Sequence, residues 1–169
     1  MSEAALSHPK ILHGQALLER LTDLRAAGKR LVFTNGCYDI LHPGHADLLH
    51  RARLLGDALL VAVNDDASVR RLGKGPGRPV NPLEVRMYMA AQLACVDIVT
   101  SFCGSTPLEC IRLVRPQALV KGGDWPLEKI VGRESVEADG GRAYSLPLLP
   151  GYSTTTLIER IRRGSSCPN

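Results

Sequence analysis

The chain has 169 residues, of which 44% are hydrophobic and 22% are charged, and its formal net charge at pH 7 is +4. These values are typical of an ordinary globular protein and leave room for one domain with a substantial core. Basic residues are scattered and only 4% of the residues are aromatic, so no nucleic-acid partner is expected.

No apolar run approaches the roughly 20 residues that span a bilayer. The first residues also lack the basic and apolar segments of a signal peptide. The five cysteines form no Cys-x-x-Cys pair, which is typical of thiols in a reducing cytosol. We therefore expect a cytoplasmic protein without a membrane partner.

Hydrophobic periodicity predicts strands and helices in alternation. A flexible N-terminal arm is expected over residues 1–12, a single domain over 13–163 and a disordered tail over 164–169. Continuous apolar runs predict buried strands at 30–34, 58–63, 97–101, 118–121 and 142–146. Amphipathic runs predict helices at 15–27, 44–55, 82–94, 107–114 and 153–163, with short helical pieces at 127–130 and 133–138.

Strands joined by helices in this way predict an α/β fold with a doubly wound, mostly parallel five-stranded sheet of the Rossmann-like kind. The first two strands and the helix between them form a βαβ unit, which should have a right-handed crossover. Open sheets of this kind bind ligands beyond the carboxyl ends of their strands. The residues that follow each strand are therefore the candidates for chemistry.

A strand, a glycine-bearing turn and a helix start meet between Asn35 and His45. Backbone N–H groups at a helix start bind anions, and residues three apart, such as His42 and His45, share one face of the helix. Together with the close backbone at Gly44, this arrangement would hold a polyphosphate. The alternative is a capping histidine beside a surface histidine. A metal site would need a third ligand, and His50 lies about 140° around the helix.

A second group of candidates lies in and after the Gly- and Pro-rich segment 73–79. Lys74 stands between glycines, where a mobile ammonium can follow a phosphate through a reaction. Arg86 on the following helix would grip a phosphate with its fork of donors. For Lys74 and Arg78 the alternative is a solvated basic loop.

A third group, Ser153, Thr154 and Thr155, begins the last helix and would bind a second phosphate. The alternative is a capping box formed by Thr156 and Glu159.

The last group is acidic and aromatic. Asp39 would orient a histidine or accept from a ligand hydroxyl, and Asp124 would take a sugar hydroxyl or help to hold Mg²⁺. Trp125 would cover a base or a sugar, or else pack in the core.

A Ser-His-Asp hydrolase is excluded because no Gly-x-Ser-x-Gly elbow occurs. Neither Gly-x-x-x-x-Gly-Lys-[Ser/Thr] nor Gly-x-Gly-x-x-Gly is present.

These motifs resemble those of the cytidylyltransferase-like nucleotidyltransferases. The resemblance rests on the run Phe33-Thr34-Asn35-Gly36-Cys37-Tyr38-Asp39, on His42-Pro43-Gly44-His45 and on Ser153-Thr154-Thr155. Within that family the chain resembles the heptose 1-phosphate adenylyltransferases, through residues 61–72, 78–82 and 119–124 as well. Tyr38 stands where Phe is more usual, and the glycine spacing around Lys74 differs slightly.

The resemblance implies that AMP passes from ATP to D-glycero-β-D-manno-heptose 1-phosphate, giving ADP-heptose and pyrophosphate on the route to the lipopolysaccharide inner core. It also implies Mg²⁺ bound through the ATP phosphates, a homodimer, and a form of the enzyme that is not fused to a sugar kinase. The attacking phosphate oxygen is already anionic, so catalysis needs alignment and charge neutralisation rather than a strong base.

Roles follow from the resemblance. The catalytic group would be His42, His45 and Lys74. The nucleotide would contact Asn35, Gly36, Cys37, Gly44, His45, Gly122, Ser153, Thr154 and Thr155. The acceptor would contact Asp39, Asn64, Lys74, Arg86, Gly123 and Asp124. Two other functions stay open: a CTP-dependent enzyme acting on glycerol 3-phosphate or a similar alcohol phosphate, and a non-catalytic nucleotide sensor.

Overall fold

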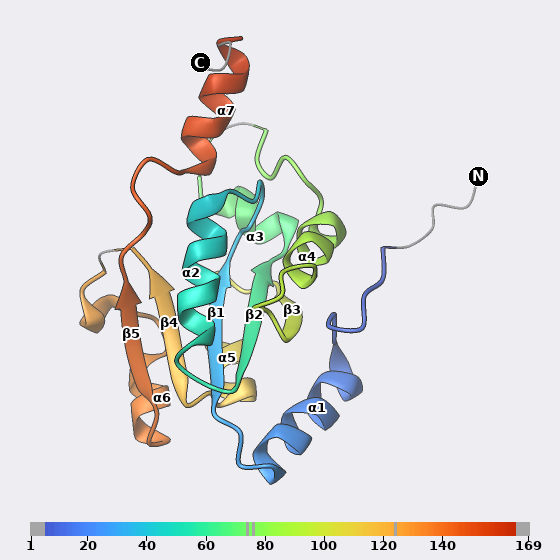
Figure 1. Ribbon diagram of the computed structural model, residues 1–169, viewed down its shortest axis with the longest axis vertical. Coiled ribbons are helices and arrows are strands. Elements are labelled where there is room, and N and C mark those ends of the chain that lie inside the picture. Colours follow the sequence, from blue (N-terminus) through green and yellow to red (C-terminus); the bar gives the residue numbers. More distant parts are fainter. Residues whose placement is uncertain (1–5, 74, 76, 124, 165–169) are drawn as a thin grey trace.

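The protein forms a five-stranded parallel sheet with the strand order β3-β2-β1-β4-β5 (Figure 1). The structure is a computed structural model that describes residues 6–73, 75, 77–123 and 125–164. The strands are β1 (Leu31–Gly36), β2 (Ala58–Asn64), β3 (Ile98–Phe102), β4 (Ala118–Gly122) and β5 (Arg142–Leu146). The predicted doubly wound α/β fold is confirmed.

Helices cover both faces of the sheet. The helices α2 (Pro43–Arg53) and α4 (Leu83–Ala91) pack on one face, and α1 (Gly14–Ala26), α5 (Leu108–Val114) and α6 (Arg133–Ala138) pack on the other. The remaining helices are α3 (Asp66–Arg71), η1 (Leu127–Lys129) and α7 (Thr154–Arg162). The short helix α3 was not predicted; its N-cap is Asp65, whose carboxylate accepts from the Ser68 backbone N–H at 2.6 Å.

The pleat of the strands decides which polar residues share a face at the carboxyl edge. Phe33 is fully buried against the α1 and α5 side and lies beside Leu60 and Leu119 in the parallel register. Because side chains alternate along a strand, Asn35, Asn64 and Lys121 continue these same rows beyond the core. Polar groups from three strands therefore meet on the α1 and α5 side of the sheet.

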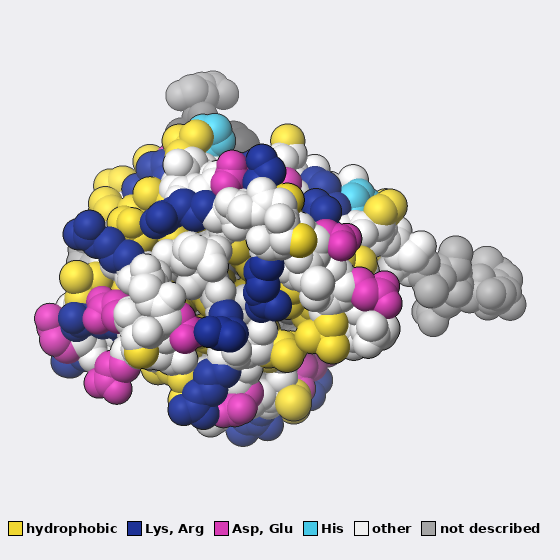
Figure 2. All heavy atoms as spheres, turned by 90° about the horizontal axis from the view of Figure 1, so that it is seen from below, with side chains coloured by type: hydrophobic (Ala, Val, Ile, Leu, Met, Phe, Trp, Pro, Cys, Tyr) yellow, Lys and Arg dark blue, Asp and Glu magenta, His cyan; other side chains and the backbone are white. Residues whose placement is uncertain are grey.

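The amino edge of the sheet carries a different surface. Figure 2 shows basic and acidic side chains interspersed over this end of the molecule. Several are paired, such as Arg53 with Asp97 at 2.8 Å and Arg115 with Asp139 at 3.0 Å.

Within the described ranges, no helix is both long enough and apolar enough to cross a membrane.

The described part of the expected N-terminal arm corrects the prediction, because it lies along the edge strand β3. Ile11 bridges to Val99, the Leu12 N–H donates to the Val99 carbonyl at 2.9 Å, and Val99 N–H donates to the Lys10 carbonyl at 2.7 Å. An edge strand has unpaired backbone groups that a further extended segment can satisfy. The segment is too short to show a periodic pattern in the sequence. Residues 1–5 and 165–169 lie outside the described residues.

Candidate functional site

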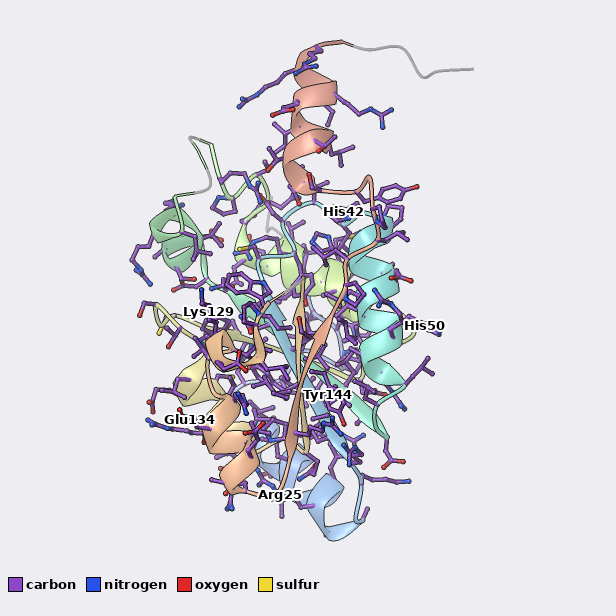
Figure 3. The ribbon with its side chains drawn as sticks, turned by 90° about the vertical axis from the view of Figure 1, so that its left-hand side faces the viewer. Arg25, His42, His50, Lys129, Glu134 and Tyr144 are labelled. Atoms are coloured by element: carbon purple, nitrogen blue, oxygen red, sulfur yellow. The ribbon has the colours of Figure 1, made fainter. Side chains whose placement is uncertain are left out.

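A stacked pair of histidines stands at the start of α2. His42 is the N-cap residue, with extended backbone angles, and Pro43 begins the helix. The centroids of the His42 and His45 rings are 3.8 Å apart, with 19° between their planes. The prediction that both imidazoles share a face is confirmed. Figure 3 shows His42 near the start of α7, whereas His50 points outward from the side of α2, as expected.

The environment of His42 favours a neutral ring. Burial lowers the pKa of His42 below its ordinary value. Its buried Nδ1 atom makes no hydrogen bond to any residue that the structure describes, so the imidazolium form gains no partner there. Two rings this close would also repel one another if both were charged. The pair therefore offers phosphates N–H donors and, at most, one full positive charge.

Tyr38 packs against the His45 ring of this pair. Its ring is 4% exposed and meets the His45 ring edge to face, at 5.3 Å between centroids and 61° between planes. Its backbone has φ of +46°, which a non-glycine residue rarely adopts. Gly36 has no side chain where a Cβ would lie 3.0 Å from the Tyr38 ring. Burial raises the pKa of Tyr38 to about 12, so the phenol stays neutral and acts through packing.

The start of α7 faces the histidine pair across a cavity. Ser153 is the N-cap, and its Oγ accepts from the Thr156 backbone N–H at 3.0 Å. This corrects the alternative in which Thr156 caps the helix. The cavity has a volume of about 390 Å³ and is lined by His42, Gly44, His45, Arg78, Leu148, Tyr152, Ser153, Thr154 and Thr155. Two helix starts thus open on one space, which suits a chain of phosphates.

Asp39 does not face this cavity. Its side chain is fully buried and forms an ion pair with Arg78, and it also accepts from the backbone N–H groups of Val80, at 2.9 Å, and Asn81, at 2.8 Å. The structure corrects the prediction that Asp39 contacts a ligand. It also corrects the alternative in which Arg78 belongs to a solvated basic loop, because Arg78 is paired with this buried carboxylate. A buried carboxylate requires such partners. Asp39 therefore anchors the end of the glycine-rich loop.

Arg86 is likewise interior. It is fully buried, and its guanidinium donates to the Cys37 carbonyl at 2.7 Å, the Asn81 carbonyl at 3.0 Å and Asp66 Oδ1 at 2.6 Å. The structure corrects the prediction that Arg86 binds a phosphate, because these three acceptors already occupy N–H groups of its guanidinium. Arg86 instead ties the turn after β1 to α3 and α4. Lys74 and Asp124, both predicted site residues, lie outside the described residues.

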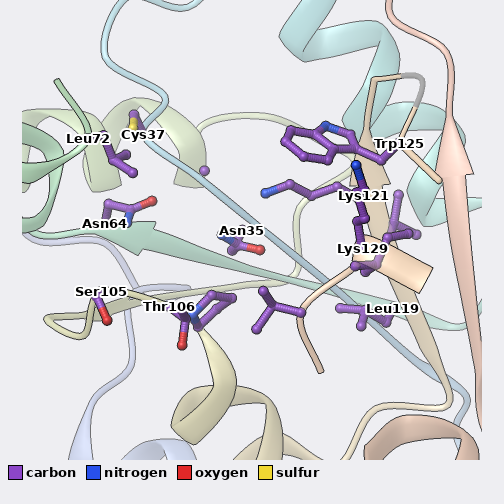
Figure 4. A pocket seen from close by; sticks show the side chains of 15 residues that line it. Asn35, Cys37, Asn64, Leu72, Ser105, Thr106, Leu119, Lys121, Trp125 and Lys129 are labelled. Atoms are coloured by element: carbon purple, nitrogen blue, oxygen red, sulfur yellow. The ribbon is translucent and has the colours of Figure 1, made fainter. Parts of the chain in front are cut away.

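A second cavity, of about 320 Å³, opens at the carboxyl edge on the α1 and α5 side of the sheet (Figure 4). It brings together four predicted residues, Asn35, Gly36, Cys37 and Asn64, and it also contains Trp125. The predicted residues Gly122 and Gly123 lie nearby, at the end of β4 and in the turn after it. Sequence reasoning missed Ser105, Thr106, Lys121 and Lys129 as lining residues. Lys121 was detectable, because it extends the inward row of β4 by one step beyond Leu119.

Cavities at the carboxyl edge of an open parallel sheet, with helix starts directed at them, define the Rossmann-like class of α/β nucleotide-binding proteins. The sequence refines this assignment. A family model described as Cytidylyltransferase-like matches residues 33–160, and the chain belongs to that family.

The chain is also similar to curated proteins of known sequence. The bifunctional protein HldE of Alkalilimnicola ehrlichii is 52% identical over 157 residues, which are 93% of this chain and 31% of that protein. The bifunctional protein HldE of Methylococcus capsulatus is 54% identical over 149 residues, or 88% of this chain and 31% of that protein. The chain thus spans about a third of the length of these curated relatives.

A solved structure shares the fold. The lipopolysaccharide core biosynthesis protein from Thermoplasma volcanium GSS1 aligns with a TM-score of 0.61 and 24% sequence identity. The alignment covers 72% of this chain and 98% of that one.

Proposed function

We propose that this protein is a nucleotidyltransferase that transfers AMP from ATP to D-glycero-β-D-manno-heptose 1-phosphate, giving ADP-heptose and pyrophosphate. The observation that carries the proposal is the pair of cavities on either side of the end of β1. One has two helix starts and the stacked histidines, and the other has polar strand ends, two lysines and a tryptophan. A transfer between two phosphate-bearing substrates needs room for both of them, and both cavities lie at the carboxyl edge of the sheet.

The choice of ATP and heptose 1-phosphate is supported by sequence. About half of the aligned residues are identical to those of HldE proteins. The motifs around His42, Asn64 and Gly122 also resemble those of heptose 1-phosphate adenylyltransferases. Residue chemistry alone does not separate adenine from cytosine, so the nucleotide is part of the test below.

The chemistry requires little from acid or base groups. An oxygen of the acceptor phosphate attacks the α-phosphorus of ATP, the new P–O bond forms, and the bond from the α-phosphorus to the bridging oxygen of pyrophosphate breaks. The attacking oxygen is already anionic. In this proposal His42 and His45 donate to the α- and β-phosphates, and the N–H groups at the start of α7 hold the β- and γ-phosphates.

Mg²⁺ is part of this proposal as an ion that enters with ATP. The carboxylates of Asp39 and Asp66 are held by Arg78 and Arg86. No group of three or more His, Cys, Asp or Glu residues suited to a metal occurs in the part of the chain that the structure describes. The described residues thus fit a metal bound through phosphate oxygens, where it would neutralise charge on the departing pyrophosphate.

The homodimer and the cytoplasmic location stay predictions.

Pyrophosphate release tests the function. ATP and CTP are each incubated with heptose 1-phosphate, with glycerol 3-phosphate or with no acceptor, and a His45→Ala protein serves as the inactive control. We expect release with ATP and heptose 1-phosphate. Release only with CTP and glycerol 3-phosphate would replace this proposal by the cytidylyltransferase alternative. Binding of nucleotide without release under any condition would support the sensor.

A further inference from the structure

One end of the second cavity is formed by an aromatic ring and a lysine that the transfer chemistry does not require. Figure 4 shows the Trp125 indole with Lys121 and Lys129 at this end, while Cys37, Asn64 and Leu72 lie at the other. The strand ends between them carry Asn35 on the side of the sheet opposite to α2. Asn35, Gly36 and Cys37, which the resemblance assigns to the nucleotide, line the same cavity. The Trp125 end lies against Gly123, which the resemblance assigns to the acceptor, so the acceptor is placed at this end.

Trp125 is held in place by its backbone and by a glycine. Its N–H lies 2.9 Å from the Gly123 carbonyl and 3.1 Å from Ser145 Oγ, and Ser145 Oγ in turn donates to the Gly123 carbonyl at 2.6 Å. The indole packs on Gly123, where a Cβ would lie 3.0 Å from Nε1. The side chain nevertheless stays 48% exposed, so it is not a core residue. A fixed, half-open aromatic face suits the apolar face of a ligand ring.

Lys129 brings an ammonium to the same wall. It is the last residue of η1 and is exposed, and its backbone N–H donates to the Pro126 carbonyl at 2.9 Å. Its ammonium makes no hydrogen bond or ion pair to any other residue that the structure describes. The neighbouring Glu128 carboxylate lies 3.9 Å from Arg133 instead. Ile130 and Val131, which follow Lys129 on the wall, are apolar. The three N–H donors of Lys129 are thus available to a ligand that presents hydroxyl groups.

We propose that Trp125 and Lys129 form the wall that selects the acceptor as a phosphorylated sugar ring. The indole covers the apolar face of the ring, and the Lys129 ammonium donates to hydroxyls at its rim. An acyclic alcohol phosphate has no ring to cover and fewer hydroxyls to bind, so it gains little from this wall. The inference rests on the proposed function, since it concerns the second substrate of the same reaction.

Fluorescence provides a direct test, because Trp125 is the single tryptophan of the sequence. Heptose 1-phosphate should change the emission of the protein in a saturable manner, and ATP alone should leave it unchanged. Lys129→Met should weaken the response to heptose 1-phosphate by about tenfold. A response to ATP alone, with none to heptose 1-phosphate, would place the indole in the nucleotide site and overturn the inference.

Kinetics provide the second readout. In Trp125→Ala and Lys129→Met, the KM for heptose 1-phosphate should rise by about tenfold, while the KM for ATP and the slow use of glycerol 3-phosphate stay near wild type. Lys29→Met is the matched control, because Lys29 lies at the amino edge beside Asp57. Unchanged selectivity between the two acceptors in both variants would overturn the inference.

The two proposals can fail separately. A wild-type protein that shows the fluorescence response but forms no ADP-heptose contradicts only the proposed function. A wild-type protein that forms ADP-heptose, with variants of unchanged selectivity and no response of Trp125, contradicts only the role of the wall. A protein with neither the response nor the product contradicts both.

Discussion

His42 and His45 stack ring on ring at 3.8 Å, one as the N-cap of α2 and the other in its first turn. The stack couples the two side chains, since neither ring can rotate without displacing the other. The ring planes lie within 19° of parallel, an arrangement that would suit donors to neighbouring oxygens of one phosphate chain. We therefore expect the pair to act as a single preorganised unit rather than as two independent donors.

Protein stability should depend on pH through His42. Burial lowers its pKa in the folded protein below the ordinary value of 6.5, so the unfolded chain binds the proton more readily. This contribution to stability is intact above about pH 6.5 and is lost as the pH falls below that value. Urea unfolding at pH 7.5 and 5.5 should show a steeper loss for wild type than for His42→Gln. His50→Gln, on the outer side of α2, is the control and should follow the wild type. An equal loss in His42→Gln would contradict the prediction.

Turnover should depend on His45. Removing a donor that stabilises the transition state costs about 100-fold or more in kcat. We expect this loss for His45→Ala in the pyrophosphate assay, with an unfolding curve close to that of the wild type. His50→Ala is the matched control and should keep the wild-type rate. A His45→Ala protein that turns over at nearly the wild-type rate would remove His45 from the catalytic group.

Gly36 should be intolerant of a side chain. A Cβ at this position would lie 3.0 Å from Tyr38 Cε2, so Gly36→Ala must displace the ring that packs on His45. Overpacking of this kind costs about 1–3 kcal/mol of unfolding free energy, and kcat should fall as well. Tyr38→Phe keeps the ring and should retain most of the activity. Wild-type kinetics in Gly36→Ala would show that the position of Tyr38 does not matter for catalysis.

The ion pair between Asp39 and Arg78 should be important for stability. Their side chains are 0% and 7% exposed, so removing one partner leaves the other charge buried without compensation. Asp39→Ala should lower the free energy of unfolding by about 3–5 kcal/mol, measured in urea. Arg115→Ala, which breaks an exposed pair with Asp139, should change it little. A small effect of Asp39→Ala would show that the loop is anchored by other contacts.

Local pattern was sufficient for most elements of the fold. The strand β5 and the helix α6 have the predicted bounds, and the other strands differ by one or two residues at their ends. The histidine pair was also predictable, because both residues belong to one helix start. The shared face follows from the spacing of three at a helix start, whereas the stacking of the two rings was not predicted.

The errors concern residues whose partners are distant in sequence. Asp39 meets a segment about 40 residues later, and Arg86 meets the carbonyl of Cys37, 49 residues earlier. A charged residue near a candidate site looks the same in sequence whether it faces a ligand or a buried counterion. Only the tertiary structure shows which partner it has. The same reason explains why Lys129 was missed, because nothing near it in the chain indicates a cavity.

The docking of residues 10–12 along β3 bears on how the protein avoids self-association. Two edges flank the sheet, and the backbone of this segment satisfies groups of Val99 on one of them. A protein shortened to begin at residue 13 would expose that edge as a template for strands of other molecules. Expression boundaries chosen to trim a supposedly dispensable arm would therefore produce a protein with the same candidate site but a stronger tendency to aggregate.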